Sequence, residues 1–326
     1  MNTNVKSELL KRMSAGKDNP VSGQQIADEY GVSRTAVWKY VKELESEGYE
    51  IGTIRKRGYY LINSPDTVAP FAIQQFLQTE NYGRSIRHVE SCPSTQILAH
   101  EEAQNGAPNG TVIIADEQTA GKGRLSRPWS SAAGKGIWMS VITRPKLTPQ
   151  QAPQMTLVAA VAIVRAIEEL TEVTPAIKWP NDILVNGRKL TGILTELQAD
   201  PDRVKAIILG IGMNVNQQLE DFPEEIRAIA TSLCIEEGQP VSRPKLAAKV
   251  LDYLELYVAL YVEKGFAPIK LLWESYADSI GKRVRISTLQ DTYEATAKGI
   301  SEDGRLEVVL DDGTIRGIYS ADIHII

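Results

Sequence analysis

The amino-acid sequence predicts a multidomain protein of mixed α+β class. Three observations support this: short amphipathic helices and a hairpin pattern near the N-terminus, mixed strand and helix patterns in the middle, and short strands at the C-terminal end. A polar, proline-bearing stretch at residues 63–70 separates the first pattern from the second, and the pattern changes again near residue 280. We therefore expect three domains, at residues 1–64, 65–277 and 278–326.

The composition fits a chain with two or three buried cores, since 43% of its 326 residues are hydrophobic and 24% are charged. No apolar run approaches the roughly 18 residues that span a bilayer, and the charged N-terminal segment lacks the apolar stretch of a secretory signal. We expect a cytoplasmic protein with no membrane partner. Cys92 and Cys234 are the only cysteines, and with the three histidines they show no metal-ligand spacing. This argues against a disulfide framework and a structural zinc site.

The first domain has the pattern of three short helices. Residues 5–13 place apolar side chains on one helical face. Ser22 begins a second helix, with Gln25 completing a capping box, and Gly31 ends it. Ser33 begins a third helix, and two short helices joined by a glycine turn predict a helix-turn-helix motif. The apolar face of the third helix is predicted to contain Val37, Trp38, Val41 and Leu44.

Positive charge gathers in this domain. Residues 1–64 hold ten Lys and Arg against eight Asp and Glu, whereas the whole chain has a net charge of −5. Residues 49–62 are predicted to form a hairpin with a basic tip, a wing suited to phosphate contact, and the start of the third helix is suited to the major groove of DNA. We expect DNA binding; a helical domain that mediates protein contacts is the alternative. The candidate DNA-contacting residues are Ser22, Ser33, Arg34, Thr35, Lys39, Lys42, Arg55, Lys56 and Arg57.

The central domain is predicted to be mixed α/β with a largely antiparallel sheet. Long amphipathic helices are expected over about residues 149–170 and 243–263. Asn186-Gly187 marks a tight hairpin. Beyond residue 280, Asp303-Gly304 and Asp312-Gly313 separate short strands, as is typical of a small all-β barrel. Strands of the central sheet are expected at residues 111–115, 136–143, 176–179, 183–185, 190–197 and 204–211.

The loop Gly121–Trp129 joins two of the expected strands. Its two glycines let the backbone approach a ligand, and Lys122, Arg124 and Arg127 supply positive charge suited to phosphate or carboxylate. The loop does not complete the Gly-x4-Gly-Lys-(Ser/Thr) pattern, which excludes a P-loop. By itself the sequence leaves two interpretations, an anion clamp or a solvated basic loop.

Three further segments are candidates for ligand binding. Ser91–Gln96 places hydroxyls and an amide near the start of a helix, where they either cap the helix or bind a ligand. A lysine between Ile177 and Trp179 is costly to bury without an anion, so Lys178 predicts a charged ligand. Gly210–Val215 permits close backbone approach, but it lacks the third glycine and the following helix of a dinucleotide-binding fingerprint.

Together these motifs resemble the biotin protein ligase family, in its bifunctional form that also acts as a repressor. The resemblance spans the whole chain, and its most specific parts are the loop Gly121–Trp129 and the segment Lys178–Asp182. It implies a winged helix-turn-helix, then a class II synthetase-like mixed α/β catalytic domain, then an SH3-like small β barrel. Ligases of the short kind lack the DNA-binding segment, so its presence here implies a repressor of genes for biotin biosynthesis and transport.

The resemblance implies a two-step reaction with ATP and biotin as substrates. Biotin's carboxylate attacks the α-phosphate of ATP to give biotinyl-5′-adenylate and pyrophosphate. A lysine of a biotin carrier domain, as in acetyl-CoA carboxylase or pyruvate carboxylase, then attacks the mixed anhydride. Both steps concentrate negative charge on phosphates, so prepositioned cations and N–H groups suit the catalysis. Mg²⁺ is implied by ATP, and the resemblance names no ligands for it.

The resemblance also implies roles for individual residues. Lys178 and Arg124 are the expected catalytic residues. Relatives often have arginine at the second loop position, whereas this chain has Lys122, a point charge that lacks the guanidinium fork. The expected biotin-binding residues are Ser94, Thr95, Gln96, Gln118, Gly121, Lys122, Gly123, Arg124, Lys178, Gly192 and Leu194. The expected ATP- and adenylate-binding residues are Arg124, Arg127, Trp129, Asn181 and Asn214.

The family's repressor role implies operator DNA and a second copy of the chain as partners. If biotinyl-5′-adenylate favours a homodimer through the central sheet, two winged helices can meet a pseudo-palindromic operator, and the intermediate becomes a corepressor. We also expect the loop Gly121–Trp129 to be mobile when empty and ordered by the adenylate.

Two other functions are alternatives. A non-catalytic transcription factor with a small-molecule sensor domain would share the helix-turn-helix and a pocket, but it would not need Lys178 beside a cationic loop. A lipoate-type acyl-adenylating ligase would share the central fold, but such ligases usually lack the winged N-terminus.

Overall fold

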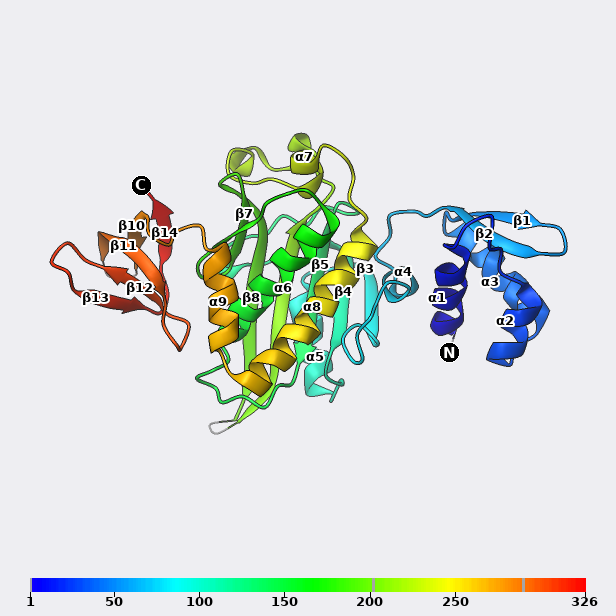
Figure 1. Cartoon of the computed structure of the whole chain (residues 1–326), viewed down its shortest axis with the longest axis horizontal. Helices are drawn as coiled ribbons and strands as arrows, with labels where there is room; N and C mark the ends of the chain where they lie inside the picture. The colour runs from blue at the N-terminus through cyan, green and yellow to red at the C-terminus, as the bar shows by residue number, and fades with distance from the viewer. Residues whose placement is uncertain (1, 201–202, 289–290) are drawn as a thin grey trace. The chain divides into compact units, whose positions relative to one another are not determined.

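The computed structural model describes residues 2–200, 203–288 and 291–326 and forms two compact units (Figure 1). The first unit comprises Met1–Gln78 and Ser242–Ala248, and the second comprises Thr79–Val241 and Lys249–Ile326. The first unit thus extends past the linker where the sequence predicts a boundary, and the C-terminal strands belong to the same unit as the central sheet.

The first unit confirms the predicted helix-turn-helix with a hairpin wing. Leu9, Leu10, Ile26 and Leu44 are fully buried in one apolar cluster, because each helix turns its apolar face inward. The two strands of the hairpin pair in antiparallel fashion. The elements are α1 (Asn2–Met13), α2 (Gly23–Tyr30), α3 (Arg34–Ser46), β1 (Glu50–Ile54), β2 (Gly58–Asn63) and α4 (Pro70–Gln74).

Serine caps begin the two helices of the motif, as the sequence predicts. The Ser33 hydroxyl accepts a hydrogen bond from the backbone N–H of Ala36 at 3.1 Å, and Ser22 accepts one from Gln25 at 3.5 Å. The second half of the predicted capping box is wrong. The Gln25 side chain donates to the Glu29 carboxylate at 3.0 Å, because a charged acceptor one turn along the helix is stronger than the backbone alternative.

Trp38 is not part of the apolar face of α3, contrary to the prediction. Its side chain is 50% exposed, whereas Val37 and Leu44 are fully buried. Trp38 lies one turn from Arg34 and one turn from Lys42, so it shares their outward face. The rest of the first unit packs against only one side of α3, the side that carries Val37, Val41 and Leu44.

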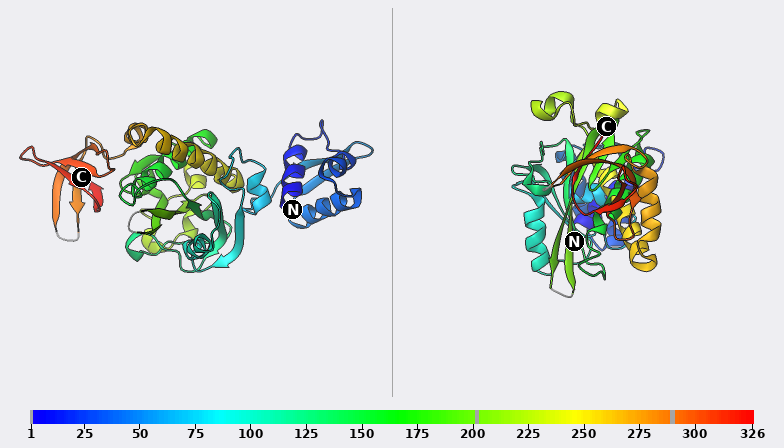
Figure 2. Two further views of the ribbon diagram at one scale, coloured as in Figure 1. Left: turned by 90° about the horizontal axis from the view of Figure 1, so that it is seen from below. Right: turned by 90° about the vertical axis from the view of Figure 1, so that its left-hand side faces the viewer.

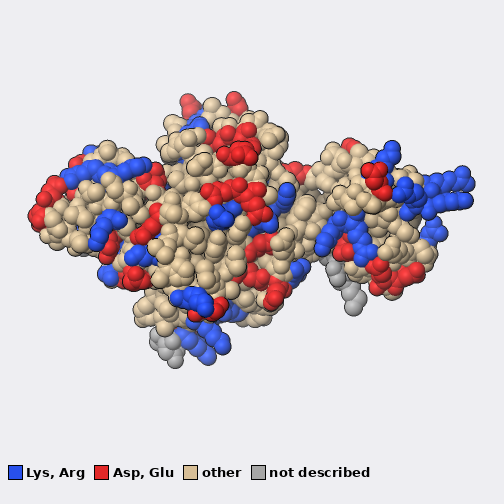
Figure 3. Space-filling view, viewed as in Figure 1, with Lys and Arg blue, Asp and Glu red and all other residues tan. Residues whose placement is uncertain are grey.

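The wing ends in a basic tip. Arg55, Lys56 and Arg57 are exposed in the turn between β1 and β2, where Lys and Arg side chains gather in Figure 3. Gly58 has φ +126°, and a Cβ built there would lie 1.9 Å from the carbonyl oxygen of Val21. Only glycine therefore lets the wing lie against the strand bridge that precedes α2.

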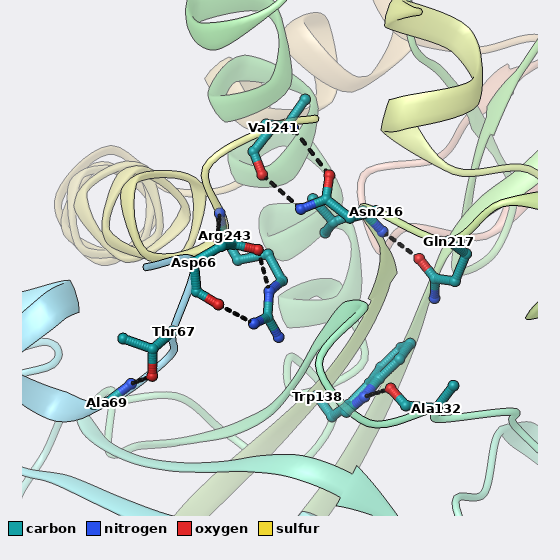
Figure 4. A network of polar contacts seen from close by, with 10 residues as sticks. Asp66, Thr67, Ala69, Ala132, Trp138, Asn216, Gln217, Val241 and Arg243 are labelled. Carbon is teal, nitrogen blue, oxygen red and sulfur yellow. Dashed lines mark hydrogen bonds and ion pairs between the residues drawn. The ribbon is translucent and has the colours of Figure 1, made fainter. Parts of the chain in front are cut away.

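The predicted linker is tied into the first unit by an ion pair (Figure 4). Arg243, whose side chain is almost fully buried, donates through Nε to the Asp66 carboxylate at 2.7 Å. Its backbone N–H donates to the other carboxylate oxygen at 2.8 Å. Because a buried guanidinium needs such partners, this contact holds the proline-bearing segment against the start of the helix at residue 243.

The second unit contains the predicted, largely antiparallel sheet of seven strands. Its strand order is β3-β4-β5-β9-β8-β7-β6, and among these neighbours only β3 and β4 run parallel. Asn186 and Gly187 both have positive φ in the β7–β8 turn, which confirms the predicted tight hairpin. The strands are β3 (Ile86–Cys92), β4 (Thr111–Gln118), β5 (Gly136–Thr143), β6 (Ala176–Lys178), β7 (Asp182–Val185), β8 (Arg188–Ala199) and β9 (Val204–Asn214).

Helices cover both faces of this sheet (Figure 2). The helix α5 (Thr95–Gln104) lies on one face, and α6 (Gln154–Leu170), α8 (Arg243–Lys264) and α9 (Ala267–Tyr276) lie on the other. The sequence predicts that α6 starts near residue 149. It begins at Gln154 because Pro153 inside a helix would lose a backbone hydrogen bond and clash with the preceding turn. Short helical turns are Leu219–Asp221, Glu224–Ile226 and α7 (Leu233–Glu237).

The C-terminal segment forms a five-stranded antiparallel sheet of order β13-β12-β11-β10-β14. The predicted turns at Gly304 and Gly313 have φ +83° and +84°. Within the described residues, no helix is long and apolar enough to cross a membrane. The strands are β10 (Arg283–Ser287), β11 (Thr292–Ile300), β12 (Leu306–Val309), β13 (Ile315–Ile318) and β14 (Asp322–Ile325).

The different environments of Leu44 and Trp38 give a stability prediction. Leu44→Ala should lower the local unfolding free energy of α3 by about 2–5 kcal/mol, because it leaves a cavity in the core. Trp38→Ala should change it by less than about 0.5 kcal/mol, because that side chain covers little of the core. Native-state hydrogen exchange of the α3 amides in the full chain measures both values, and equal losses would place Trp38 in the core after all.

Candidate active site

A pocket of about 190 Å³ opens in the second unit. It lies where the start of α5, the loop Gly121–Trp129, the turn before β7, the strands β8 and β9 and the start of β14 meet. Most of the residues predicted for biotin and adenylate binding line it. These are Ser94, Thr95, Gln96, Gln118, Lys122, Gly123, Arg124, Arg127, Trp129, Lys178, Asn181, Gly192 and Leu194.

Gly121 and Asn214 do not line the pocket. Gly121 packs against the other end of its own loop, where a Cβ would come within 2.6 Å of the carbonyl oxygen of Trp129. Asn214 is buried at the end of β9, and its side-chain oxygen accepts a hydrogen bond from Gln217 at 3.1 Å. The structure therefore gives Gly121 a role in loop packing and places Asn214 among protein partners.

The floor of the pocket contains three glycines of the sheet. Gly192 of β8 pairs directly with Gly212 of β9, and Gly210 lies two pairs along the ladder, opposite Leu194. A Cβ on Gly212 would lie 2.5 Å from the indole nitrogen of Trp129, and one on Gly210 would lie 2.9 Å from the amide of Gln96. Glycine at these positions lets two polar side chains lie flat against the backbone.

The start of α5 forms a closed hydrogen-bond network. Ser94 caps the helix, as its hydroxyl accepts from the Gln96 N–H at 3.4 Å. Gln118 accepts from the backbone N–H of Thr95 at 2.9 Å, and the Thr95 hydroxyl lies 2.8 Å from that of Ser140. Capping and pocket lining are thus combined in the same residues rather than being alternatives.

Two buried polar atoms of the pocket have neither a hydrogen-bond nor an ion-pair partner among the described residues. They are the amide oxygen of Gln96 and the indole nitrogen of Trp129. A buried acceptor or donor without a partner costs about 1–3 kcal/mol, so such atoms in a pocket wall indicate where a ligand supplies the missing bond.

The basic loop is folded as a narrow hairpin. The backbone N–H of Gly123 donates to the carbonyl of Arg127 at 2.8 Å, and a single helical turn, Arg124–Ser126, lies between them. Arg124 donates to Asn181 at 3.1 Å and to Ser320 at 2.7 Å. Burial lowers the pKa of the Arg124 guanidinium, while the nearby carboxylate of Asp182 acts in the opposite direction.

Arg127 is paired with Asp322 at the start of β14. Its Nη1 donates to Oδ1 at 3.2 Å, and its Nη2 contacts the other carboxylate oxygen. The bond from Arg127 lowers the pKa of Asp322, so this carboxylate is charged at neutral pH. Sequence reasoning missed Asp322, because nothing in the local pattern of a distant short strand links it to the loop.

Lys178 and Lys122 line the pocket without an ion-pair partner in the described part of the chain. Sequence reasoning missed a further lysine, Lys189, whose Nζ lies 2.7 Å from the Asp182 carboxylate and 5.4 Å from the centre of the Trp129 ring. The register of the β7–β8 hairpin brings it there, and the Asn186-Gly187 turn is the only sequence signal for that register.

The contact between Gly212 and Trp129 is testable. Gly212→Ala should displace the indole, because a Cβ at 2.5 Å is well inside contact distance. We expect a shift in Trp129 emission and faster acrylamide quenching, each measured as the difference from a matching Trp129→Phe protein. Gly123→Ala is the control, since its nearest atom would be 3.7 Å away, and equal spectra for both variants would contradict the packing.

Comparisons with known proteins agree with this geometry. Residues 88–214 match the biotin/lipoate A/B protein ligase family, residues 6–60 an HTH domain, and residues 279–325 the biotin protein ligase C terminal domain. The bifunctional ligase/repressor BirA of Bacillus subtilis is 47% identical over 325 residues, covering 100% of both chains. BirA of Escherichia coli is 27% identical over 93% of this chain and 92% of its own.

A solved structure of a biotin protein ligase resembles a large part of this chain. The biotin protein ligase from Aquifex aeolicus, in complex with biotin and ATP, matches with a TM-score of 0.65 and 31% identity, over 74% of this chain and 99% of that chain. Because the identity to the Bacillus subtilis protein extends over both chains and all three family models match, the chain belongs to the family of bifunctional biotin ligase/repressor proteins.

Proposed function

We propose that the chain joins biotin to a lysine of biotin carrier domains in two ATP-dependent steps and represses transcription by binding operator DNA. The carboxylate oxygen of biotin attacks the α-phosphorus of ATP, and the bond to pyrophosphate breaks. The lysine amine of the carrier then attacks the carbonyl carbon of biotinyl-5′-adenylate. AMP leaves, and the amine gives up a proton as the amide forms.

The observation that carries the ligase proposal is the composition of one pocket. It brings Lys122, Lys178 and Arg124 together with a buried, unpartnered acceptor on Gln96 and donor on Trp129. Cations suit the carboxylate and phosphates of the reactants, and a neutral donor and acceptor suit an uncharged polar ring system. A sensor domain for a neutral metabolite would not need the cations.

Lys178 and Arg124 are the proposed catalytic residues. Lys178 is partly buried at the end of β6 without a carboxylate partner, so its charge is available to the carboxylate of biotin and the α-phosphate oxygens. Arg124 is held in place by Asn181 and Ser320. Positive groups already fixed before the reaction stabilise the negative charge that develops on phosphate, which lowers the barrier without an acid–base pair.

The two ends of the pocket are proposed to bind different parts of the biotinyl-5′-adenylate. Ser94, Thr95, Gln96 and Gln118 are proposed for the ring end of biotin, and Gly192 and Leu194 for the floor beneath it. Arg127, Trp129 and Asn181 are proposed for the adenylate. Gly121 and Asn214 lie outside the pocket lining. Gly121 is therefore proposed to support the fold of the loop. Asn214 can reach the adenine side only if its hydrogen bond with Gln217 is broken.

Mg²⁺ enters the proposal only as the partner of ATP phosphates. Among the described residues the pocket is lined by two carboxylates, Asp182 and Asp322, and each is close to a cation of the protein. The described residues hold no group of three or more His, Cys, Asp or Glu side chains that fits a metal ion. The side chains present do not form a magnesium site of their own.

The repressor proposal rests on the first unit. Arg34, Thr35 and Lys39 are exposed at the start of α3, and Arg55 and Lys56 are exposed in the wing. The helix is suited to base edges in the major groove and the wing to phosphates. We propose that biotinyl-5′-adenylate promotes a homodimer through the central sheet, which places two such units on a pseudo-palindromic operator.

The ligase is tested with a lysine variant and a matched control. Lys178→Met should lower the rate of adenylate formation by about 10²–10³-fold, because it removes one preorganised charge from the reacting phosphate. Lys135→Met is the control, since Lys135 pairs with Asp221 away from the pocket. The measurement is covalent transfer to an apo carrier domain with ATP, Mg²⁺ and either biotin or lipoate. Transfer of lipoate instead, or of neither acid, would contradict the proposal.

DNA binding is tested through its salt dependence. On a duplex selected by the protein from a random pool, with biotin and ATP present, Arg55→Ala combined with Lys56→Ala should reduce the slope of log affinity against log salt by about 2, because each contact to phosphate contributes about 0.9. Lys264→Ala, at an exposed helix end of the second unit, should leave the slope unchanged. Equal slopes for the wild type and the wing variant would show that the wing does not contact DNA.

A further inference from the structure

The side-chain amide of Gln96 is held in one orientation. Its nitrogen donates to the Glu196 carboxylate at 2.8 Å. A carboxylate only accepts, so the atom facing it must be the NH₂ group and not the carbonyl. The carbonyl oxygen therefore points away from Glu196. It is buried, and no described residue donates to it.

Glu196 is itself held from two sides. His100, one turn after Gln96 in α5, places its Nε2 3.0 Å from the same carboxylate oxygen. Gln198, two residues after Glu196 in β8, donates to Nδ1 of His100 and to its backbone carbonyl, both at 3.0 Å. Residues four apart on a helix and two apart on a strand share a face. The four side chains form a ladder between α5 and the sheet, with the His100 proton on Nε2.

The pairing of β8 with its neighbours shows on which face of the sheet this ladder lies. Thr195 lies on the opposite face of β8, where its hydroxyl is 2.7 Å from that of Thr156 in α6. Gly192, Leu194 and Glu196 therefore share the α5 face. Gly210 adds the last constraint, since a Cβ there would lie 2.9 Å from the carbonyl oxygen of Gln96. The free acceptor thus lies against bare backbone in the wall of the pocket.

We infer that Glu196, braced by His100 and Gln198, is a positioning residue that presents the Gln96 carbonyl to one ureido N–H of biotin. The inference rests on the proposed function and concerns how this pocket selects its substrate. The ureido ring carries two N–H donors, and a ring without a donor at this point would leave the acceptor buried and unpaired. A ladder that only ties α5 to the sheet would affect stability but not the choice of ligand.

The test is Glu196→Gln in the full-length protein. A glutamine can offer either its carbonyl or its NH₂ group, so the Gln96 amide is no longer fixed and its NH₂ group can turn toward the pocket. The KM for biotin should rise about tenfold, equivalent to about 1.4 kcal/mol, while kcat and the KM for ATP stay unchanged. Calorimetric binding of biotin alone should weaken by the same factor.

Two biotin analogues separate positioning from general disturbance. In each, an oxygen replaces one of the two ureido N–H groups. The wild type should reject one analogue more strongly than the other, and Glu196→Gln should reduce that difference. Asp116→Asn is the matched control, because Asp116 pairs with His88 at 2.9 Å in the same sheet and neither residue lines the pocket. It should leave the preference intact.

A double variant completes the test. If Glu196 acts through Gln96, then Glu196→Gln should add nothing to the biotin KM of Gln96→Ala. Additive losses, an unchanged biotin KM in folded Glu196→Gln, or an unchanged analogue preference would each overturn the inference. Rescue by Glu196→Asp of part of the preference supports it. A wild type that binds no biotin would instead overturn the proposed function itself.

Discussion

Glycine facing glycine across the β8–β9 ladder is the constraint on which the active site depends. Gly192 and Gly212 form a pair without side chains, and Gly210, two residues from Gly212 on the same face, removes a third side chain opposite Leu194. A side chain at Gly212 would meet the Trp129 indole and one at Gly210 would meet Gln96. These two side chains come from different elements and both lie against the same backbone, so the positions of Gln96 and Trp129 in the pocket require that Gly210 and Gly212 have no Cβ.

The electrostatics of the pocket follow from how its cations are paired. Arg127 and Lys189 lie beside carboxylates, whereas Lys122 and Lys178 have no ion-pair partner in the described ranges. The paired cations keep loop and hairpin in place, and the others leave positive potential for an anionic ligand. Clustered charge of one sign is costly to hold without a counter-charge, so a pocket of this kind favours phosphate and carboxylate over neutral ligands.

The DNA-binding unit has a hydrophobic core of its own. Its core is complete without the sheet of the second unit, because Leu9, Leu10, Ile26 and Leu44 bury one another. The exposed basic residues of α3 and the wing add nothing to that core. Those residues can therefore be replaced without opening a cavity in the core. The exposed Trp38 adds an apolar surface on the same face as Arg34 and Lys42.

By itself the sequence determined the features that depend on near neighbours. Serine caps, the Asn186-Gly187 hairpin, the apolar strands and the glycine-rich basic loop all follow from interactions within a few residues, and the family resemblance named most of the pocket. Tertiary structure alone decided which side of α3 is covered, so Trp38 was misplaced. It also brought Lys189 and Asp322 to the pocket and Glu196 to Gln96. Strand register and the docking of distant segments place those residues, and no local pattern encodes either.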